Sequence, residues 1–233
     1  MKSNLDALEE KLGLSFQDKD LLQEALTHRS YLNENPSWPL SNNERLEFLG
    51  DAVLELAVTE ELFKRFPEKE EGELTVYRAA LVNTRRLREI AGELGIDKSV
   101  LVSKGEARDL NGRGGETVLA DAVEAIIGAI HLDQGYGESK KFVAKFILSY
   151  LDKVVETGGK DAKSLVQEIA QEKYNVTPVY KTLEESGPAH ERLFKAGLYI
   201  GDKLESEGEG SSKQEAELDA AHRLLKRNLE LKV

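Results

Sequence analysis

One segment of the chain is apolar on almost every face that a helix would present. From Val118 to Ile130, only Asp121 and Glu124 interrupt a run of Val, Leu, Ala, Ile and Gly residues. A helix that is hydrophobic all round is normally buried in a core, and residues three apart lie on the same side of it. An ionised carboxylate buried there is costly unless a cation compensates it. The segment therefore predicts a buried helix with two acids facing a positive charge.

A second segment repeats this arrangement. Glu44, Glu47 and Asp51 have the spacing i, i+3 and i+7 among Leu, Phe, Ala and Val residues, so they share one helical stripe. Two such helices facing one another form a cage of carboxylate oxygens, which are the ligands that Mg²⁺ and Mn²⁺ prefer. The alternative is that the acids form buried ion pairs with arginines, for which the candidates are Arg45, Arg78, Arg85 and Arg86. Five acids on two otherwise apolar helices favour the metal site.

The composition narrows the possible chemistry. The chain contains no cysteine, which excludes a disulfide framework, thiolate metal sites and a thiol nucleophile. No apolar run reaches the ~20 residues that a membrane helix needs, and the first residues contain no signal-peptide core. We therefore expect a soluble, cytoplasmic protein that has no membrane partner.

The chain divides into two parts of different character. Up to residue 155 the apolar periodicity predicts only helices, and the clearest ranges are 44–58, 60–66, 83–94, 118–132 and 140–151. The polar, glycine-containing stretch 156–161 predicts a linker. The remainder predicts a helix at 164–174, three strands at 178–183, 193–200 and 203–208, and a last helix capped by Ser211 or Ser212. The expected fold is an all-α domain over 1–155, then an α+β domain of order helix–strand–strand–strand–helix over 162–230.

The acidic segment Asn43–Val53 resembles the signature of bacterial ribonuclease III. The likeness extends to other parts of the first domain, namely Ala25–Ser30, Glu71–Thr75, Arg78-Ala79, Leu119–Ala125 and Leu132–Gly135. The second domain is similar to a double-stranded-RNA-binding domain through Leu165–Glu168, Gly187–His190 and Gly210–Lys213. The resemblance covers nearly the whole chain, in the family's domain order.

This resemblance implies a homodimeric endoribonuclease that hydrolyses double-stranded RNA with Mg²⁺, for which Mn²⁺ is a possible substitute. The implied products carry 5′-phosphate and 3′-hydroxyl ends with staggered cuts, and the implied substrates are rRNA and mRNA precursors. Two alternatives are a non-catalytic double-stranded-RNA-binding protein on the same fold and a helical metal hydrolase acting on small phosphorylated molecules. The retained acids disfavour the first alternative, and the α+β domain disfavours the second.

The resemblance also implies individual roles, by matched position. The catalytic residues are Asp51 and Glu124. The implied metal site consists of Glu47, Asp51, Asp121 and Glu124. Glu44 and Glu71 match outer, auxiliary acidic positions of the family. Phe48 and Leu49 match positions at the dimer seam.

The net charge of −11 argues mildly against nucleic-acid binding, so we expect RNA contacts through local patches. Double-stranded RNA is recognised by shape, through 2′-hydroxyls and phosphates. The candidate contacts are Gln167 and Glu168 on a helix, Pro188 and His190 in a turn, and Ser211, Ser212 and Lys213 at a helix start whose N–H groups favour a phosphate.

Two departures from the family pattern matter. Lys213 is followed by Gln214 and Glu215, where the family usually has consecutive lysines, so we expect weaker or more salt-sensitive RNA binding. The acidic side chains that precede this point are Glu205, Glu207 and Glu209. The second departure is a loop over 105–115 that is longer than expected, so the resemblance assigns no RNA contact to its arginines, Arg108 and Arg113.

Overall fold

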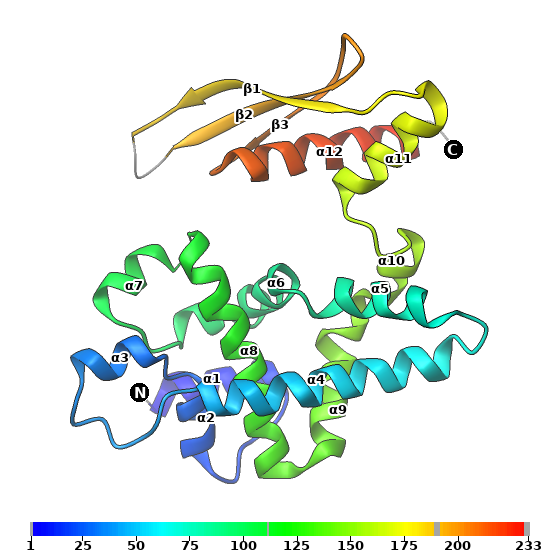
Figure 1. Ribbon diagram of the computed structural model, residues 1–233. Coiled ribbons are helices and arrows are strands. Elements are labelled where there is room, and N and C mark those ends of the chain that lie inside the picture. The colour runs from blue at the N-terminus through cyan, green and yellow to red at the C-terminus, as the bar shows by residue number, and fades with distance from the viewer. Residues whose placement is uncertain (1, 111, 189–191, 231–233) are drawn as a thin grey trace. The chain divides into compact units, whose positions relative to one another are not determined.

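The computed structural model describes residues 2–110, 112–188 and 192–230 (Figure 1). The chain forms two compact units that divide between Gly159 and Lys160. The helices of the first unit are α1 (Lys2–Leu12), α2 (Lys19–Ala25), α3 (Arg29–Glu34), α4 (Glu44–Arg65), α5 (Glu71–Val82), α6 (Thr84–Leu94), α7 (Lys104–Asp109), α8 (Arg113–Gln134), α9 (Tyr136–Phe146) and α10 (Leu151–Glu156). Short 3₁₀ turns lie at Ile96–Lys98 and Leu148–Tyr150.

Helix α8 is the central element of this first unit. It packs against α4, α6, α2 and α9 (Figure 1). Its apolar residues from Leu119 to Ile130 are buried, while Asp121 and Glu124 are only partly covered. The predicted buried helix with two acids on one side is therefore confirmed.

Two local predictions in this unit were wrong. The ranges 44–58 and 60–66 form one continuous helix, α4, because no Pro interrupts it before Pro67. Much of the predicted 105–115 loop is helical, since α7 occupies Lys104–Asp109 and α8 begins at Arg113. The Ser103 hydroxyl caps α7 by accepting a hydrogen bond from the backbone N–H of Glu106 (3.2 Å).

The second unit has the predicted α+β order. It consists of α11 (Ala162–Tyr174), β1 (Val179–Ser186), β2 (Leu193–Ile200), β3 (Lys203–Gly210) and α12 (Lys213–Glu230). The strands form an antiparallel sheet in the order β1–β2–β3, and both helices cover one face of it (Figure 1). A β-carbon at Gly208 would lie 2.1 Å from the backbone nitrogen of Ala220, so a glycine allows α12 to lie directly on β3.

The segment between the units is partly structured. Gly158 and Gly159 have φ values of +62° and +74°, and their N–H groups donate to the carbonyls of Val155 and Val154 at the end of α10. Asp161 then caps α11 by accepting from the backbone N–H groups of Lys163 (2.9 Å) and Ser164 (3.0 Å). The predicted linker 156–161 thus contains the end of one helix and the cap of the next.

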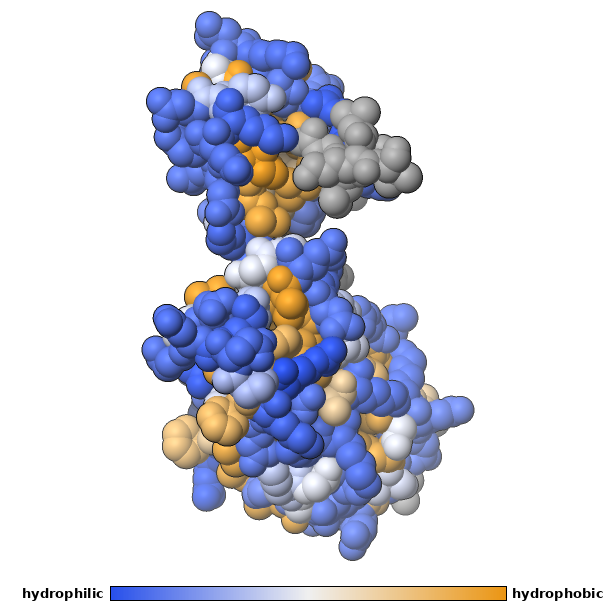
Figure 2. All heavy atoms as spheres, turned by 90° about the vertical axis from the view of Figure 1, so that its right-hand side faces the viewer, coloured by the Kyte–Doolittle hydropathy of each residue, from blue (hydrophilic) through white to orange (hydrophobic). Residues whose placement is uncertain are grey.

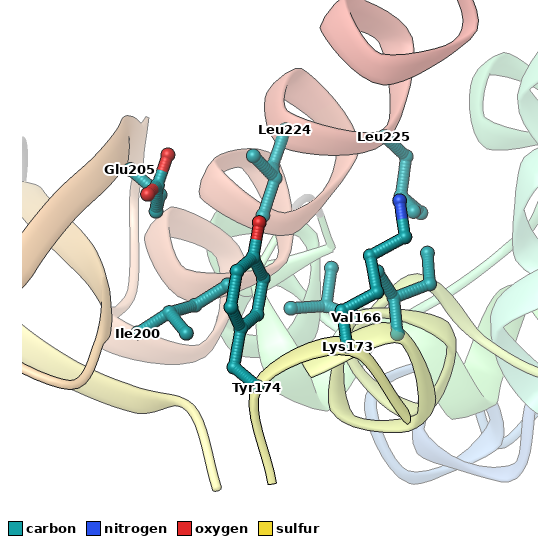
Figure 3. A pocket seen from close by; sticks show the side chains of 8 residues that line it. Val166, Lys173, Tyr174, Ile200, Glu205, Leu224 and Leu225 are labelled. Carbon is teal, nitrogen blue, oxygen red and sulfur yellow. The ribbon is translucent and has the colours of Figure 1, made fainter. Parts of the chain in front are cut away.

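The surface that each unit shows in Figure 2 is mainly hydrophilic, and the second unit contains a small internal cavity. In the view of Figure 2, each unit shows a mainly hydrophilic surface with a limited hydrophobic area. A cavity of about 40 Å³ lies between α11, α12 and the sheet, where Tyr174 and Ile200 face Leu224 (Figure 3). That volume is large enough for a water molecule. Among the described residues, no helix is long and apolar enough to cross a membrane.

Candidate metal centre

Three of the predicted acids converge between α4 and α8. The side chains of Glu47, Asp121 and Glu124 each offer an oxygen, and these oxygens lie within 4.8 Å of one another. All three residues are partly buried. Glu47 thus forms a single set of oxygen ligands with two acids that lie 74 and 77 positions later in the chain. This donor set suits a hard divalent cation such as Mg²⁺ or Mn²⁺.

Two glycines allow the helices to approach this closely. A β-carbon at Gly50 would lie 1.7 Å from the carbonyl oxygen of Glu124, and one at Gly128 would lie 2.2 Å from the carbonyl oxygen of Leu46. The backbones of α4 and α8 therefore touch at this crossing, about one turn from Glu47 and from Glu124. Sequence reasoning missed both glycines. The signal that could have found them is a glycine inside an apolar helix, because alanine is the better helix former unless another backbone comes too close.

The arginine alternative is not supported. Among the described residues, no lysine or arginine forms an ion pair with Glu47, Asp121 or Glu124. Arg78 instead pairs with Glu55 (3.0 Å), and Arg86 pairs with Glu89 (2.5 Å). The other two arginines considered lie elsewhere. Burial raises the pKa of Glu24, and the charge of the nearby Arg45 partly offsets that rise. Arg85 is exposed. Within the part of the chain that the structure describes, no lysine or arginine therefore compensates the acids of the cluster.

The pKa values of the three clustered acids are all raised. Burial raises the pKa of Glu124 to about 8, and the charges of Asp51, Asp121 and Glu47 add to the effect. Burial and the nearby Glu47 carboxylate raise the pKa of Asp121 to about 6. Burial also raises the pKa of Glu47, with contributions from Glu44 and Asp51. A divalent cation relieves this repulsion, which is the behaviour expected of a metal site.

The other predicted acids lie around the cluster or apart from it. Asp51 is exposed, one turn after Glu47, and its charge acts on both Glu47 and Glu124. Glu44 is exposed and lies 3.4 Å from the Arg29 guanidinium. Glu71 begins α5, where its carboxylate accepts a hydrogen bond from the Thr75 hydroxyl (3.1 Å), and it does not belong to the three-residue cluster.

The two residues predicted at a dimer seam lie in different environments. Phe48 is 81% exposed, whereas Leu49 is partly buried and packs against the core. Phe48 belongs to an exposed apolar stripe along α4, which continues with Leu56 (51% exposed) and Phe63 (75% exposed). This α4 stripe has no covering element among the described residues.

The predicted RNA contacts on α11 form a shallow polar surface. The residues that line it are Lys160, Ser164, Gln167, Glu168, Gln171 and Glu172. Lys160 donates to both carboxylate oxygens of Glu168, at 2.7 and 2.6 Å. Pro188 is exposed, while His190 lies outside the described residues. Glu168 therefore has a cationic partner within the second unit.

The start of α12 also has an internal partner. Ser212 caps the helix by accepting a hydrogen bond from the backbone N–H of Glu215 (3.2 Å). The Glu215 carboxylate in turn accepts from the backbone N–H of Ser211 (2.8 Å). This arrangement resembles a capping box, and it places a carboxylate beside the predicted phosphate position. The Lys213 ammonium lies 5.9 Å from the ring centroid of Phe194.

The fold and the cluster together define a two-domain protein, in which a helical domain suited to a divalent cation precedes an α+β domain. Comparison with protein families matches residues 18–151 to Ribonuclease-III-like proteins and residues 162–228 to the double-stranded RNA binding motif. The chain belongs to the ribonuclease III family. Members of this family depend on a divalent metal, in agreement with the acidic cluster.

Individual relatives agree with this assignment. Ribonuclease 3 of Borreliella burgdorferi is 44% identical over 226 residues, which are 97% of this chain and 91% of that protein. Ribonuclease 3 of Enterococcus faecalis is 44% identical over 94% of this chain and 95% of that protein. The crystallised nuclease domain of ribonuclease III from Campylobacter jejuni is 43% identical, with a TM-score of 0.54, and the match covers 62% of this chain and 96% of that one.

Proposed function

We propose that this protein is an endoribonuclease that hydrolyses phosphodiester bonds of double-stranded RNA with Mg²⁺, for which Mn²⁺ can substitute. The observation that carries the proposal is the convergence of Glu47, Asp121 and Glu124 within 4.8 Å, with no cationic partner among the described residues. The double-stranded RNA binding motif over 162–228 supplies the substrate class. The family assignment supports catalysis over the non-catalytic alternative.

The acids divide into two roles in this proposal. Glu47, Asp121 and Glu124 hold the cation, and their partial burial keeps them in place. A bound Mg²⁺ supplies an activated water and offsets negative charge on the phosphate. Asp51 is exposed beside this set, where it can orient water or the RNA strand, so we assign Asp51 and Glu124 as the catalytic residues. Glu44 is proposed as an auxiliary acid that acts through Glu47.

The protein is further proposed to act as a homodimer through the α4 stripe. Exposed aromatic residues of this size on a soluble surface mark an association site, and a stripe along one straight helix fits a second copy of the same helix. The related Campylobacter nuclease domain has a region involved in dimer formation. Phe63→Lys is expected to produce a monomer in analytical ultracentrifugation, whereas an unchanged mass would place the dimer contact elsewhere.

A dimer carries two metal centres, which allows one cut in each strand of a duplex. We propose staggered products with 5′-phosphate and 3′-hydroxyl ends, and precursors of rRNA and mRNA as substrates. Glu71, which begins α5 and lies outside the cluster, is proposed as an auxiliary acid for RNA positioning or a further ion.

The test is incubation with a perfect RNA duplex, with and without Mg²⁺, followed by analysis of the product ends. The expected result is cleavage only with Mg²⁺, only of the duplex, and with 5′-phosphate ends. A gel shift with the same duplex in Ca²⁺ measures binding separately. Binding without cleavage in every divalent cation would instead support the non-catalytic alternative.

A further inference from the structure

The acidic stripe of α4 continues beyond the metal centre. Glu55 lies one turn after Asp51, on the same side of the helix. Its side chain is 39% exposed, and its negative charge is felt at Glu124, where it adds to the rise in pKa. The helix therefore presents a further acid next to a cluster whose negative charges have no lysine or arginine partner among the described residues.

Arg78 holds this further acid. Its Nε atom lies 3.0 Å from a carboxylate oxygen of Glu55, and its Nη1 atom donates to the Thr59 hydroxyl at 3.2 Å. Arg78 belongs to α5, which packs against α4. Because Glu55 and Thr59 are one turn apart, the guanidinium bridges two successive positions of α4 and is fixed in direction.

We propose that Arg78 is a positioning residue for the metal centre, which holds Glu55 outside the ligand set and balances its charge. The inference rests on the proposed function, since it concerns the ion and RNA affinity of that site. The contrast within α4 supports it: Glu55 has an arginine partner, whereas the three clustered acids have none among the described residues.

The balance matters because the ion and the RNA respond to charge in opposite ways. Without Arg78, Glu55 adds a negative charge that attracts a divalent cation and repels a phosphate. Arg78→Ala is therefore expected to lower the Mg²⁺ concentration for half-maximal activity and to raise KM for duplex RNA, each by about fivefold for one uncompensated charge. A purely structural defect would not reduce the requirement for Mg²⁺.

The experiment is a double-mutant cycle in the full-length protein, with Arg78→Ala, Glu55→Gln and the combined variant. Kinetics are measured on one RNA duplex over a range of Mg²⁺ concentrations, and thermal unfolding is followed in parallel. Glu55→Gln is expected to shift both constants in the opposite direction, and the combined variant is expected to return them toward wild type. Arg78→Lys is expected to retain most of the wild-type behaviour. Arg65→Ala is the matched control, because Arg65 forms a surface ion pair with Asp152 (2.8 Å).

The outcomes separate the possible failures. If the combined variant has the same KM and the same Mg²⁺ requirement as Arg78→Ala, then Arg78 acts by touching RNA or by supporting the fold, and the inference is wrong. If Arg78→Ala changes neither constant, the inference is also wrong, while the proposed nuclease function stands. If the unaltered protein does not cleave duplex RNA, the proposed function itself fails.

Discussion

The acidic side chains of the two domains differ in whether they have partners within the protein. At the metal centre, Glu47, Asp121 and Glu124 are held together without a cationic side chain among the described residues. On the parts of the second domain that are predicted to contact RNA, Glu168 is paired with Lys160, and Glu215 accepts a hydrogen bond from Ser211. The first site is thus arranged in advance for an ion, whereas RNA binding at the predicted contacts of the second domain would require these internal partners to be exchanged. Catalysis should therefore be sensitive to small changes in geometry, and RNA binding to charge and salt.

The largest expected effect follows from removing one metal ligand. Glu124→Gln keeps the size of the side chain but removes its charge, so the cation loses a ligand at the centre of the cluster. We expect duplex cleavage to fall by at least about 10³-fold, within the range seen when one key electrostatic group is lost, while the gel shift with duplex RNA is unchanged.

The matched control for this prediction is Glu138→Gln, because Glu138 pairs with Lys141 on α9 away from the cluster (2.6 Å). The control is expected to cleave normally. Equal loss of cleavage and RNA binding in Glu124→Gln would show that Glu124 supports the fold instead of the chemistry.

The helix crossing should be nearly as sensitive. In Gly128→Ala the new methyl group would meet the Leu46 carbonyl at 2.2 Å, so α4 and α8 must separate. We expect destabilisation of about 1–3 kcal/mol, which is typical of overpacking, together with weaker Mg²⁺ dependence of stability. Urea unfolding with and without Mg²⁺ measures both effects.

Gly92→Ala in α6 provides the comparison, because nothing lies within 4 Å of a β-carbon at Gly92. It should be neutral or slightly stabilising, since alanine favours a helix. If Gly128→Ala behaves like Gly92→Ala, the close approach of the helices does not set the geometry of the ligands.

The unpaired acids also predict a pH dependence of the metal-free protein. The pKa of Glu124 is raised from 4.5 to about 8 and that of Asp121 from 3.8 to about 6, so the folded state binds more protons than the unfolded state between these values. Stability of the helical domain is therefore expected to fall as the pH rises from about 5 to about 8. Thermal unfolding in EDTA across this range measures the trend, and Mg²⁺ should restore most stability at the upper end. A metal-free protein that becomes more stable with rising pH would contradict uncompensated acids.

The smallest expected effect concerns RNA affinity. Gln214→Lys adds a cation at the start of α12, beside Lys213, and supplies one more phosphate contact. We expect duplex affinity to rise several-fold and the slope of log K against log salt to steepen by about 0.9. Thr177→Lys, which adds the same charge at an exposed position between α11 and β1, is the control, and an equal gain in both variants would indicate a general charge effect.

The sequence predicted those features that depend on periodicity. The apolar pattern of Val118–Ile130 predicted a buried helix, and the acid spacing on α4 and α8 predicted which side chains could meet. Periodicity cannot reveal how closely two helices approach, so the contact between Gly50 and Gly128 was missed. It also cannot assign partners across elements, so the pairs Glu55–Arg78 and Lys160–Glu168 emerged only from the fold. The short helix α7 was missed because six residues carry too little pattern to separate a helix from a loop.

Acids from α4 and α8 are expected to bind one divalent cation together. The most direct test is a crystal of the protein grown with Mn²⁺, examined for anomalous scattering. We predict a peak within bonding distance of carboxylate oxygens from Glu47, Asp121 and Glu124. A peak at other residues only, or an arginine or lysine inserted among these three acids, would contradict it.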